Sequence, residues 1–457
     1  PMSQDIGKEE KYIKMTQTPE TKLVIEFAIP AVIIMIITSI YNIVNSYFVG
    51  KLGTNEAAAV QLVFPVMIII QAIGLFFGQG AGNFISREMG AKSFDKVAKM
   101  ASTGFYSTII LGVLLAALGT AFLKPFAVML GANQDTLQYA EAYLRLILWS
   151  TPFMASALVL NVILRFQGYA SLGMVGIVSG AVLCSILDPL LIIVLQLGVS
   201  GASLSTFISQ FVSFMILLVG SFKAGGISIK LRDFTPSLYY MKEMARGGLP
   251  SLIKQGLTAV ASFLMNKVAG SYDVSVVAAV GYVQRISVFA ASAVAGLGQG
   301  LQPVCGFNYG AKMYDRVKKS FWFAIKLGTG IMLALSLAGI FFAPQLIKFF
   351  RDDPEVIKVG AFMLRAQSLT YPLMPIATIG SMFLQTLGKA TRASLLAVAR
   401  QGMFLIPALL LMTKLFDLVG FQISQPVADL LAFALGVFFI VGVFREMDRF
   451  SQEAKRV

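Results

Sequence analysis

The chain has 457 residues, of which 57% are hydrophobic and only 13% are charged. Soluble domains are closer to half apolar and a quarter charged, so this composition excludes an ordinary soluble fold. The formal charge of +14 could suggest a nucleic-acid partner, but the basic residues collect in the connections between apolar runs, a pattern typical of membrane topology.

The apolar runs are about 20 residues long, the length that a helix needs to cross a bilayer. They predict an all-α polytopic membrane protein with twelve transmembrane helices. The expected helices are 23–48, 57–82, 100–122, 142–164, 170–194, 200–221, 247–270, 275–300, 317–341, 359–385, 392–414 and 426–446. The predicted parts are a cytoplasmic segment 1–22, an N-lobe 23–221, a cytoplasmic linker 222–246, a C-lobe 247–446 and a cytoplasmic tail 447–457.

Lysine and arginine are concentrated near both ends of the chain and in alternate loops, which predicts that both termini are cytoplasmic. The two cysteines, Cys184 and Cys305, fall inside apolar runs, which favours a membrane that faces a reducing cytosol. We therefore expect a multi-pass monomer in a bacterial or archaeal plasma (inner) membrane, with the lipid bilayer as a partner and no nucleic acid.

An internal repeat with an offset of 220 residues relates the two halves. Gly78-Gln79-Gly80 matches Gly298-Gln299-Gly300, and Gly90-Ala91-Lys92 matches Gly310-Ala311-Lys312. Further pairs are Pro30 with Pro250, Arg145 with Arg365, Pro152 with Pro372, and Gly168 with Gly388. Because each unit has an even number of helices, the two six-helix lobes should share one orientation. Such repeats are related by a pseudo-two-fold axis along the membrane normal, with a substrate path near the midplane.

Asp188 is the one acidic residue that the sequence places well inside an expected helix, and an intramembrane carboxyl is a functional candidate because it is costly. The other acids near spans lie at expected helix ends that water reaches: Glu26, Glu141, Asp429 and Glu446. At a depth similar to that of Asp188 the sequence places Asn45, Cys184 and Thr206. Together these groups could bind a proton, since burial favours the neutral carboxyl, or a hard cation such as Na⁺.

These four residues, Asn45, Cys184, Asp188 and Thr206, are predicted to form a polar pocket in the first half only. The residues 220 positions later are Met265, Phe404, Ala408 and Pro426. The second half instead carries the cations Lys254, Arg285, Lys326 and Arg400. We expect Lys254 and Arg400 to extend their aliphatic side chains so that their charged groups reach the cytoplasmic surface. Arg285 lies near mid-helix and needs a carbonyl, an acid or an anionic ligand. Since no nucleotide-binding loop is present, an ion gradient is the expected energy source.

Several motifs make the chain resemble the multidrug and toxic compound extrusion (MATE) family over essentially its whole length. They are Tyr41-Asn42-Ile43-Val44-Asn45, Phe48 to Gly53, Gly90 to Val97, Leu187-Asp188-Pro189, Gln302-Pro303 with Gly306 and Asn308 to Ala311, and Ala399-Arg400-Gln401 with Pro407. The resemblance implies two six-helix lobes and a central cavity. It also implies export of amphipathic, often cationic, organic compounds in exchange for H⁺ or Na⁺, with no cofactor and no enzymatic activity.

The family pattern matches the chain at Asp188, Thr206, Tyr41 and Asn161, and the last two, with Arg285, are candidates for the substrate cavity. The chain departs from it at Asn45, where similar members carry a carboxylate, and at Cys184, where they often carry asparagine. The missing carboxylate favours H⁺ over Na⁺ as the coupling ion, although Na⁺ at Asp188 stays an alternative. An alternative function is that of a flippase of lipid-linked or other anionic precursors. A third is that of a passive channel.

Overall fold

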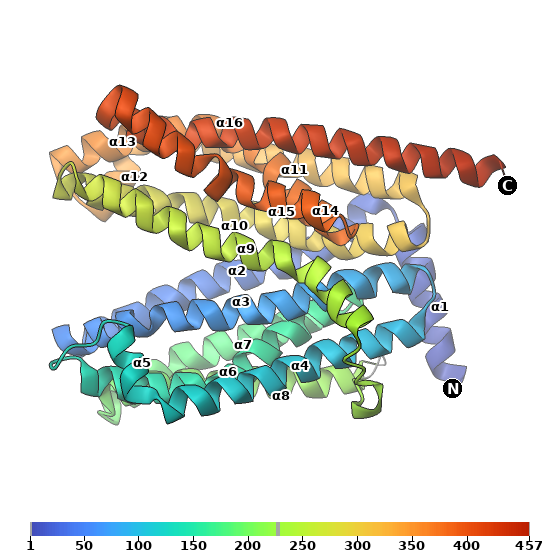
Figure 1. Cartoon of the computed structure of the whole chain (residues 1–457), viewed down its shortest axis with the longest axis horizontal. Coiled ribbons are helices and arrows are strands. Elements are labelled where there is room, and N and C mark those ends of the chain that lie inside the picture. The colour runs from blue at the N-terminus through green and yellow to red at the C-terminus, as the bar shows by residue number, and fades with distance from the viewer. Residues whose placement is uncertain (1, 225–228, 457) are drawn as a thin grey trace. The chain divides into compact units, whose positions relative to one another are not determined.

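The computed structural model describes residues 2–224 and 229–456, and the side chains of 7–224 and 229–454. All regular structure within these residues is helical, with no strand (Figure 1). Nine of the described helices are long and apolar enough to cross a membrane. Their surfaces carry many exposed large side chains, such as Ile43, Val288 and Phe438, which a bilayer would cover.

The chain forms two compact units. Unit 1 comprises Pro1–Tyr12 and Ile33–Gly248, and unit 2 comprises Ile13–Val32 and Leu249–Val457. Three helices contribute to both units: α1 (Met2–Gln17), α2 (Glu20–Gly50) and α9 (Leu238–Gly270). The predicted lobes 23–221 and 247–446 have different bounds, because they assign the whole of each repeat's first helix to one lobe. That division stays a prediction.

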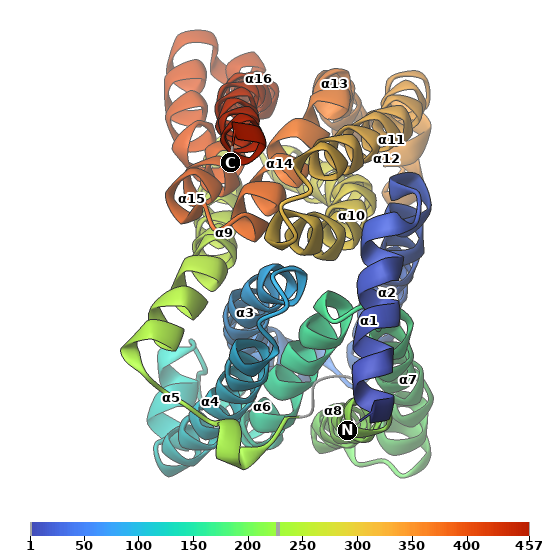
Figure 2. The same ribbon diagram turned by 90° about the vertical axis from the view of Figure 1, so that its right-hand side faces the viewer.

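Unit 1 is built around α6 (Leu137–Phe166), which packs against most of the other helices of the unit (Figure 2). These helices are α3 (Thr54–Gly90), α4 (Phe94–Ala121), α5 (Leu123–Met129), α7 (Ala170–Pro189) and α8 (Gly198–Lys223). The π-helical turn η1 (Leu190–Val194) and the short η2 (Leu231–Asp233) complete the unit. Tyr143, Leu144 and Ile147 of α6 are almost fully buried, so α6 forms the centre of the unit.

Unit 2 is centred on α10 (Val274–Gly310) and α14 (Met374–Thr386), which pack against each other. The remaining helices are α11 (Tyr314–Phe341), α12 (Ala343–Phe350), α13 (Pro354–Thr370), η3 (Tyr371–Leu373), α15 (Ala390–Val398), η4 (Ala399–Met403) and α16 (Leu405–Arg456). Close backbone approaches need small residues here. A Cβ on Gly300 would lie 2.4 Å from backbone atoms of Ala28, so only glycine permits α2 to lie this close to α10.

The local backbone repeats at the 220-residue offset. Lys92 and Lys312 both have a φ of 59°, and Gly168 and Gly388 also have positive φ values. A positive φ is unusual for lysine, so its recurrence at equivalent turns shows that the two halves fold alike locally.

One predicted helix is divided by a proline-containing turn. The expected helix 359–385 is split into α13 and α14 by η3, because Pro372 and Pro375 remove two backbone donors within one turn. The equivalent Pro152 is alone and α6 stays continuous. The helix α16 breaks at Asp417, whose φ is 54°, which is between the predicted helices 392–414 and 426–446. A Cβ on Gly420 would lie 1.8 Å from the carbonyl oxygen of Met412, so the chain folds back there.

The predicted linker 222–246 is shorter in the structure, because α8 continues to Lys223 and α9 begins at Leu238. Residues 225–228 lie outside the described part. The remainder is bound to α4: the backbone nitrogens of Lys230 and Thr235 donate to the hydroxyls of Ser102 and Thr103, each over 3.1 Å. These bonds satisfy linker amides that would otherwise be unpaired.

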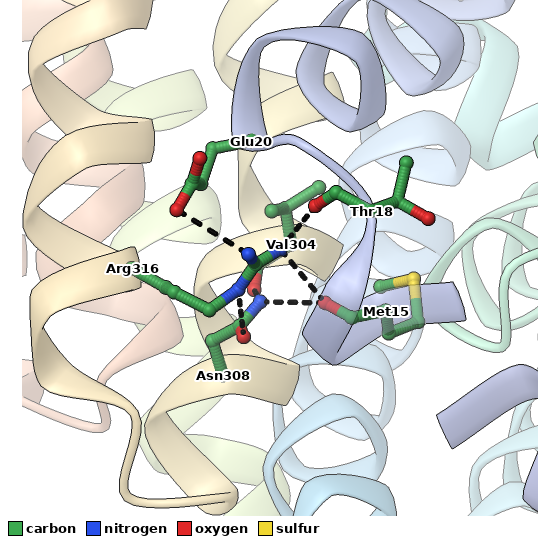
Figure 3. A network of polar contacts seen from close by, with 6 residues as sticks. All are labelled: Met15, Thr18, Glu20, Val304, Asn308 and Arg316. Atoms are coloured by element: carbon green, nitrogen blue, oxygen red, sulfur yellow. Dashed lines mark hydrogen bonds and ion pairs between the residues drawn. The ribbon is translucent and has the colours of Figure 1, made fainter. Parts of the chain in front are cut away.

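A polar network in unit 2 holds the connection between α1 and α2 (Figure 3). Asn308 donates from Nδ2 to the carbonyl oxygens of Met15, over 3.1 Å, and Val304, over 2.9 Å. Arg316 donates to Oδ1 of Asn308 over 3.1 Å, to the carbonyl oxygen of Thr18, and to Glu20 over 3.3 Å. The motif that ends in Asn308-Tyr309-Gly310-Ala311 therefore has a structural role: its Asn308 side chain, with Arg316, satisfies carbonyl groups where α1 ends.

Candidate functional site

Asp188 lies in the last turn of α7 and has no exposed surface. Pro189 follows it, and the chain then continues as the π-helical turn η1. Proline lacks the N–H that an α-helix requires, and π-helical turns are often found at functional sites. The local sequence thus changes the helix geometry directly beside a buried carboxyl.

The partners of Asp188 are neutral. Asn45 of α2 donates from Nδ2 to Oδ2 over 3.0 Å, and Cys184 lies one turn earlier in α7, with its Sγ 3.8 Å from Oδ1. No ion pair to Asp188 occurs in the part of the chain that the structure describes. A buried carboxyl without a cationic partner is costly when ionised, so this arrangement favours a group that can take up a proton.

The structure adds Ser205 of α8, which the sequence analysis did not single out. Its Oγ lies 3.2 Å from Sγ of Cys184 and donates to the carbonyl oxygen of Cys184 over 3.2 Å. Its neighbour Thr206 is buried but donates to Ala202 of its own helix over 3.2 Å. The hydroxyl joined to Cys184 therefore comes from Ser205, and a role for Thr206 stays a prediction.

Two tyrosines complete the surroundings. Tyr41 of α2 and Tyr143 of α6 lie within electrostatic range of Cys184 and Asp188. Tyr143 is almost fully buried, and its hydroxyl lies 3.9 Å from Sδ of Met67. Tyr41 was expected from the family resemblance, whereas Tyr143 lies in an apolar run that gives no functional signal.

The repeat and the site can be compared with known proteins. The MatE family model matches residues 30–190 and 250–410, two stretches that differ by the 220-residue offset of the internal repeat. The chain belongs to the MATE family. This confirms the resemblance that the motifs indicated, and the offset confirms the repeat. Because members of this family are transporters, the chain is a multi-pass membrane transporter and not an enzyme.

Individual relatives cover nearly the whole chain. A multidrug export protein, MepA, from Staphylococcus haemolyticus is 28% identical over 439 residues, which are 95% of this chain and 96% of the relative. The crystal structure of a MATE protein in the bent conformation has a TM-score of 0.90 and 26% identity, and covers 96% and 99% of the two chains. A MOP superfamily transporter from Pyrococcus furiosus, whose binding pocket is described as having reverse polarity, has a TM-score of 0.88 and 26% identity, and covers 95% and 98%.

The predicted cavity residues Asn161 and Arg285 belong to different units of this MATE protein. Asn161 of α6 packs against Gly173 of α7: a Cβ on Gly173 would lie 2.9 Å from its Nδ2. Gly173 precedes Asp188 by 15 positions on one helix, which corresponds to about 22 Å at 1.5 Å per residue. Arg285 belongs to unit 2, is exposed, and has no hydrogen bond or ion pair to the described residues. Within unit 1, Asn161 therefore lies away from the site around Asp188.

A cavity of 470 Å³ in unit 1 lies between α3, α4, α5 and α6. It is lined mainly by apolar side chains, among them Ile70, Leu115, Phe126 and Leu148. None of the predicted site residues lines it. It therefore does not locate the substrate path.

The expectation that water reaches Asp429 at a helix end is wrong. Asp429 is only 2% exposed and forms an ion pair with Arg400, whose Nε lies 2.7 Å from Oδ1. The expectation that Arg400 extends to the surface is wrong for the same reason. The error arose because α16 folds back at Asp417 and continues as one long helix, which places Asp429 in its interior.

Proposed function

We propose that this MATE protein is a secondary active multidrug exporter, which moves amphipathic, often cationic, organic compounds out of the cell by antiport against protons. The observation that carries the proposal is the buried Asp188 carboxyl with neutral partners in a transporter fold. The MepA relative, named as a multidrug export protein, supports the cargo class.

Asp188 would bind one proton at a carboxylate oxygen when it faces the outside and release it to the cytosol after the protein changes state. A ligand shifts a two-state equilibrium only by binding one state more tightly. The proton and the cargo would therefore favour opposite states, so that proton entry drives cargo export. We place this exchange in twelve spans arranged as two six-helix lobes about a pseudo-two-fold axis, in a monomer with both termini in the cytosol of a bacterial or archaeal cell.

The donor set supports H⁺ over Na⁺. Hard cations prefer a shell of several oxygen atoms, but Asn45 directs its nitrogen to Asp188, and Cys184 contributes sulfur. Among the described residues, no three of His, Cys, Asp and Glu gather in one place. One carboxyl with neutral neighbours is sufficient to carry a proton.

Transport assays with Asp188→Asn test the proposal. Everted vesicles are energised by a pH gradient, with and without Na⁺, and uptake of a cationic dye is measured. We expect proton-driven uptake to fall to background in Asp188→Asn, while Asp135→Asn, which alters an exposed acid of unit 1, stays at the wild-type rate. Unchanged uptake in Asp188→Asn would remove this carboxyl from the mechanism, and Na⁺-dependence without a pH effect would overturn the choice of ion.

The alternative function is a flippase of lipid-linked or other anionic amphipathic precursors. The exposed Arg285, which has no partner among the described residues, favours this alternative, as does the related transporter described as having a pocket of reverse polarity. A panel of dyes and lipid-linked sugars in proteoliposomes separates the two functions, because only an exporter moves the dyes.

A further inference from the structure

A second buried polar cluster lies entirely within unit 2. Asp429 accepts hydrogen bonds from Arg400 Nε over 2.7 Å, Gln425 Nε2 over 3.0 Å and Thr370 Oγ1 over 2.8 Å. Both carboxylate oxygens are therefore satisfied, and the carboxylate is neutralised by one cation. Asp429 needs no further ligand.

Arg400 is not satisfied in the same way. It uses only Nε on Asp429, and its two terminal nitrogens make no hydrogen bond or ion pair with any residue that the structure describes. Its side chain keeps 13% of its surface exposed. Guanidinium presents its donors as a planar fork that matches carboxylate and phosphate oxygens, so the unused edge is suited to an oxyanion.

Lys254 of α9 adds a second cation. It lies within electrostatic range of Arg400, is half-buried, and has no acidic partner in the described part of the chain. The cluster thus holds two cations, Lys254 and Arg400, and one acid, which leaves an uncompensated positive charge. Arg400 and Asp429 belong to the apolar segment Ala390–Ala454, which is long enough to cross a membrane. Such charge is costly in a membrane and is offset when an anion binds.

Hydroxyl groups lie beside the same cluster. Tyr371 of η3 is within electrostatic range of both Arg400 and Asp429. Its hydroxyl lies 2.9 Å from Oγ of Ser287, which in turn donates to Gln367 over 2.7 Å. Arg400 itself lies in the π-helical turn η4. Irregular backbone is therefore present on two sides of the cluster.

The fold does not require these charges. The equivalents of Lys254, Arg400 and Asp429 in the first repeat are Ile34, Gly180 and Ser209. Gly180 there packs directly on Ser209, whose carbonyl oxygen would lie 3.1 Å from an added Cβ. The same helix pair therefore packs without any charge in unit 1, which argues against a purely structural role in unit 2.

We propose that Arg400 and Lys254 form an oxyanion-binding subsite in unit 2, which takes the carboxylate or phosphate group of an amphipathic molecule. The inference rests on the proposed export function for its cargo and extends the cargo class to zwitterionic and anionic compounds. The same chemistry could come from a carboxylate on the cargo or from a lipid phosphate.

Equilibrium binding tests the subsite without any transport. The full chain in phosphatidylcholine nanodiscs is titrated with a cationic xanthene dye that carries a free carboxylate, and with its methyl ester, by fluorescence anisotropy. The variants are Lys254→Met and Arg400→Lys, which keeps a cation for Asp429. The control is Lys326→Met, which removes an exposed cation of unit 2.

We expect Lys254→Met and Arg400→Lys to weaken binding of the carboxylate dye by about tenfold, since a charged hydrogen bond contributes that much. In the same two variants, binding of the ester should change by less than about twofold. In the Lys326→Met control, binding of the carboxylate dye should also change by less than about twofold. If Arg400→Lys does not fold, Lys254→Met decides, because Lys254 has no ion pair among the described residues. If phosphatidylglycerol competes with the carboxylate dye for the wild-type protein but not for Lys254→Met, the subsite binds a lipid phosphate. Absence of competition assigns it to the cargo carboxylate.

Equal weakening of both dyes, or no effect beyond that of Lys326→Met, would overturn the subsite. A wild-type protein that binds the ester but not the carboxylate dye would also overturn it and leave the proposed export function intact. A wild-type protein that binds neither dye would contradict both.

Discussion

Asn45 Nδ2 donates to Asp188 Oδ2 over 3.0 Å and so joins α2 to the last turn of α7. The helix α2 begins in unit 2 and continues into unit 1, where Asn45 lies. A change of charge on Asp188 therefore acts on a helix that both units share. Under the proposed proton coupling, this link is the route by which protonation of Asp188 would favour one state.

Substitution of Asn45 by Asp should shift the pH dependence of transport. It would place a second carboxyl within hydrogen-bond distance of Asp188, and two such carboxyls do not readily ionise together. We expect the pH of half-maximal dye transport in proteoliposomes to rise by about one unit or more. Asn42→Asp is the control, because Asn42 is exposed on the same helix. An unchanged pH profile in Asn45→Asp would contradict the coupling of these residues.

Ser205 and Thr206 should differ in their effect. Ser205→Ala removes the hydroxyl that contacts Cys184, so we expect a shift in the pH profile of transport. Thr206→Val removes a bond to its own helix only, and should leave the profile unchanged. The reverse ranking, measured in the same dye-transport assay, would show that the family's threonine acts here and that Ser205 does not.

Removal of one partner of the buried Arg400–Asp429 pair should destabilise the protein. Asp429→Leu leaves a buried guanidinium unpaired, which costs about 3 to 5 kcal/mol. We expect a lower midpoint of denaturant unfolding for the detergent-solubilised protein. The double variant Arg400→Met with Asp429→Leu should regain most of the loss, since an apolar pair of similar volume packs well. If the double variant is no better than the single one, the loss does not come from an unpaired charge.

Arg316→Ala should loosen the connection between α1 and α2. The substitution removes bonds to Thr18, Glu20 and Asn308, and hydrogen bonds to charged groups contribute about 1.5 to 3 kcal/mol each. We expect faster amide hydrogen exchange in residues 13–22, measured by mass spectrometry. Lys319→Ala, which alters an exposed side chain of α11, should leave exchange there unchanged. Equal exchange in both variants would mean that the network does not hold this connection.

The sequence predicted Asp188, Asn45 and Cys184 as neighbours because periodicity and depth are local properties of a helix. It missed Ser205 because serine is common in membrane helices and nothing in the chain indicates which hydroxyl turns toward α7. It missed Tyr143 because an aromatic residue in an apolar run is expected to belong to the hydrophobic core. It misplaced Asp429 because its depth depends on where the preceding helix turns back, at Asp417.

The sequence by itself determined the membrane class, the family and the 220-residue repeat, because apolar run length and spaced glycines and prolines are written along the chain. Only the tertiary structure decided that Arg400 pairs with Asp429, that Ser205 joins Cys184, and that α2 and α9 each contribute to both units. These relations join residues far apart in sequence. They are set by helix rotation and packing, for which composition and periodicity carry no information.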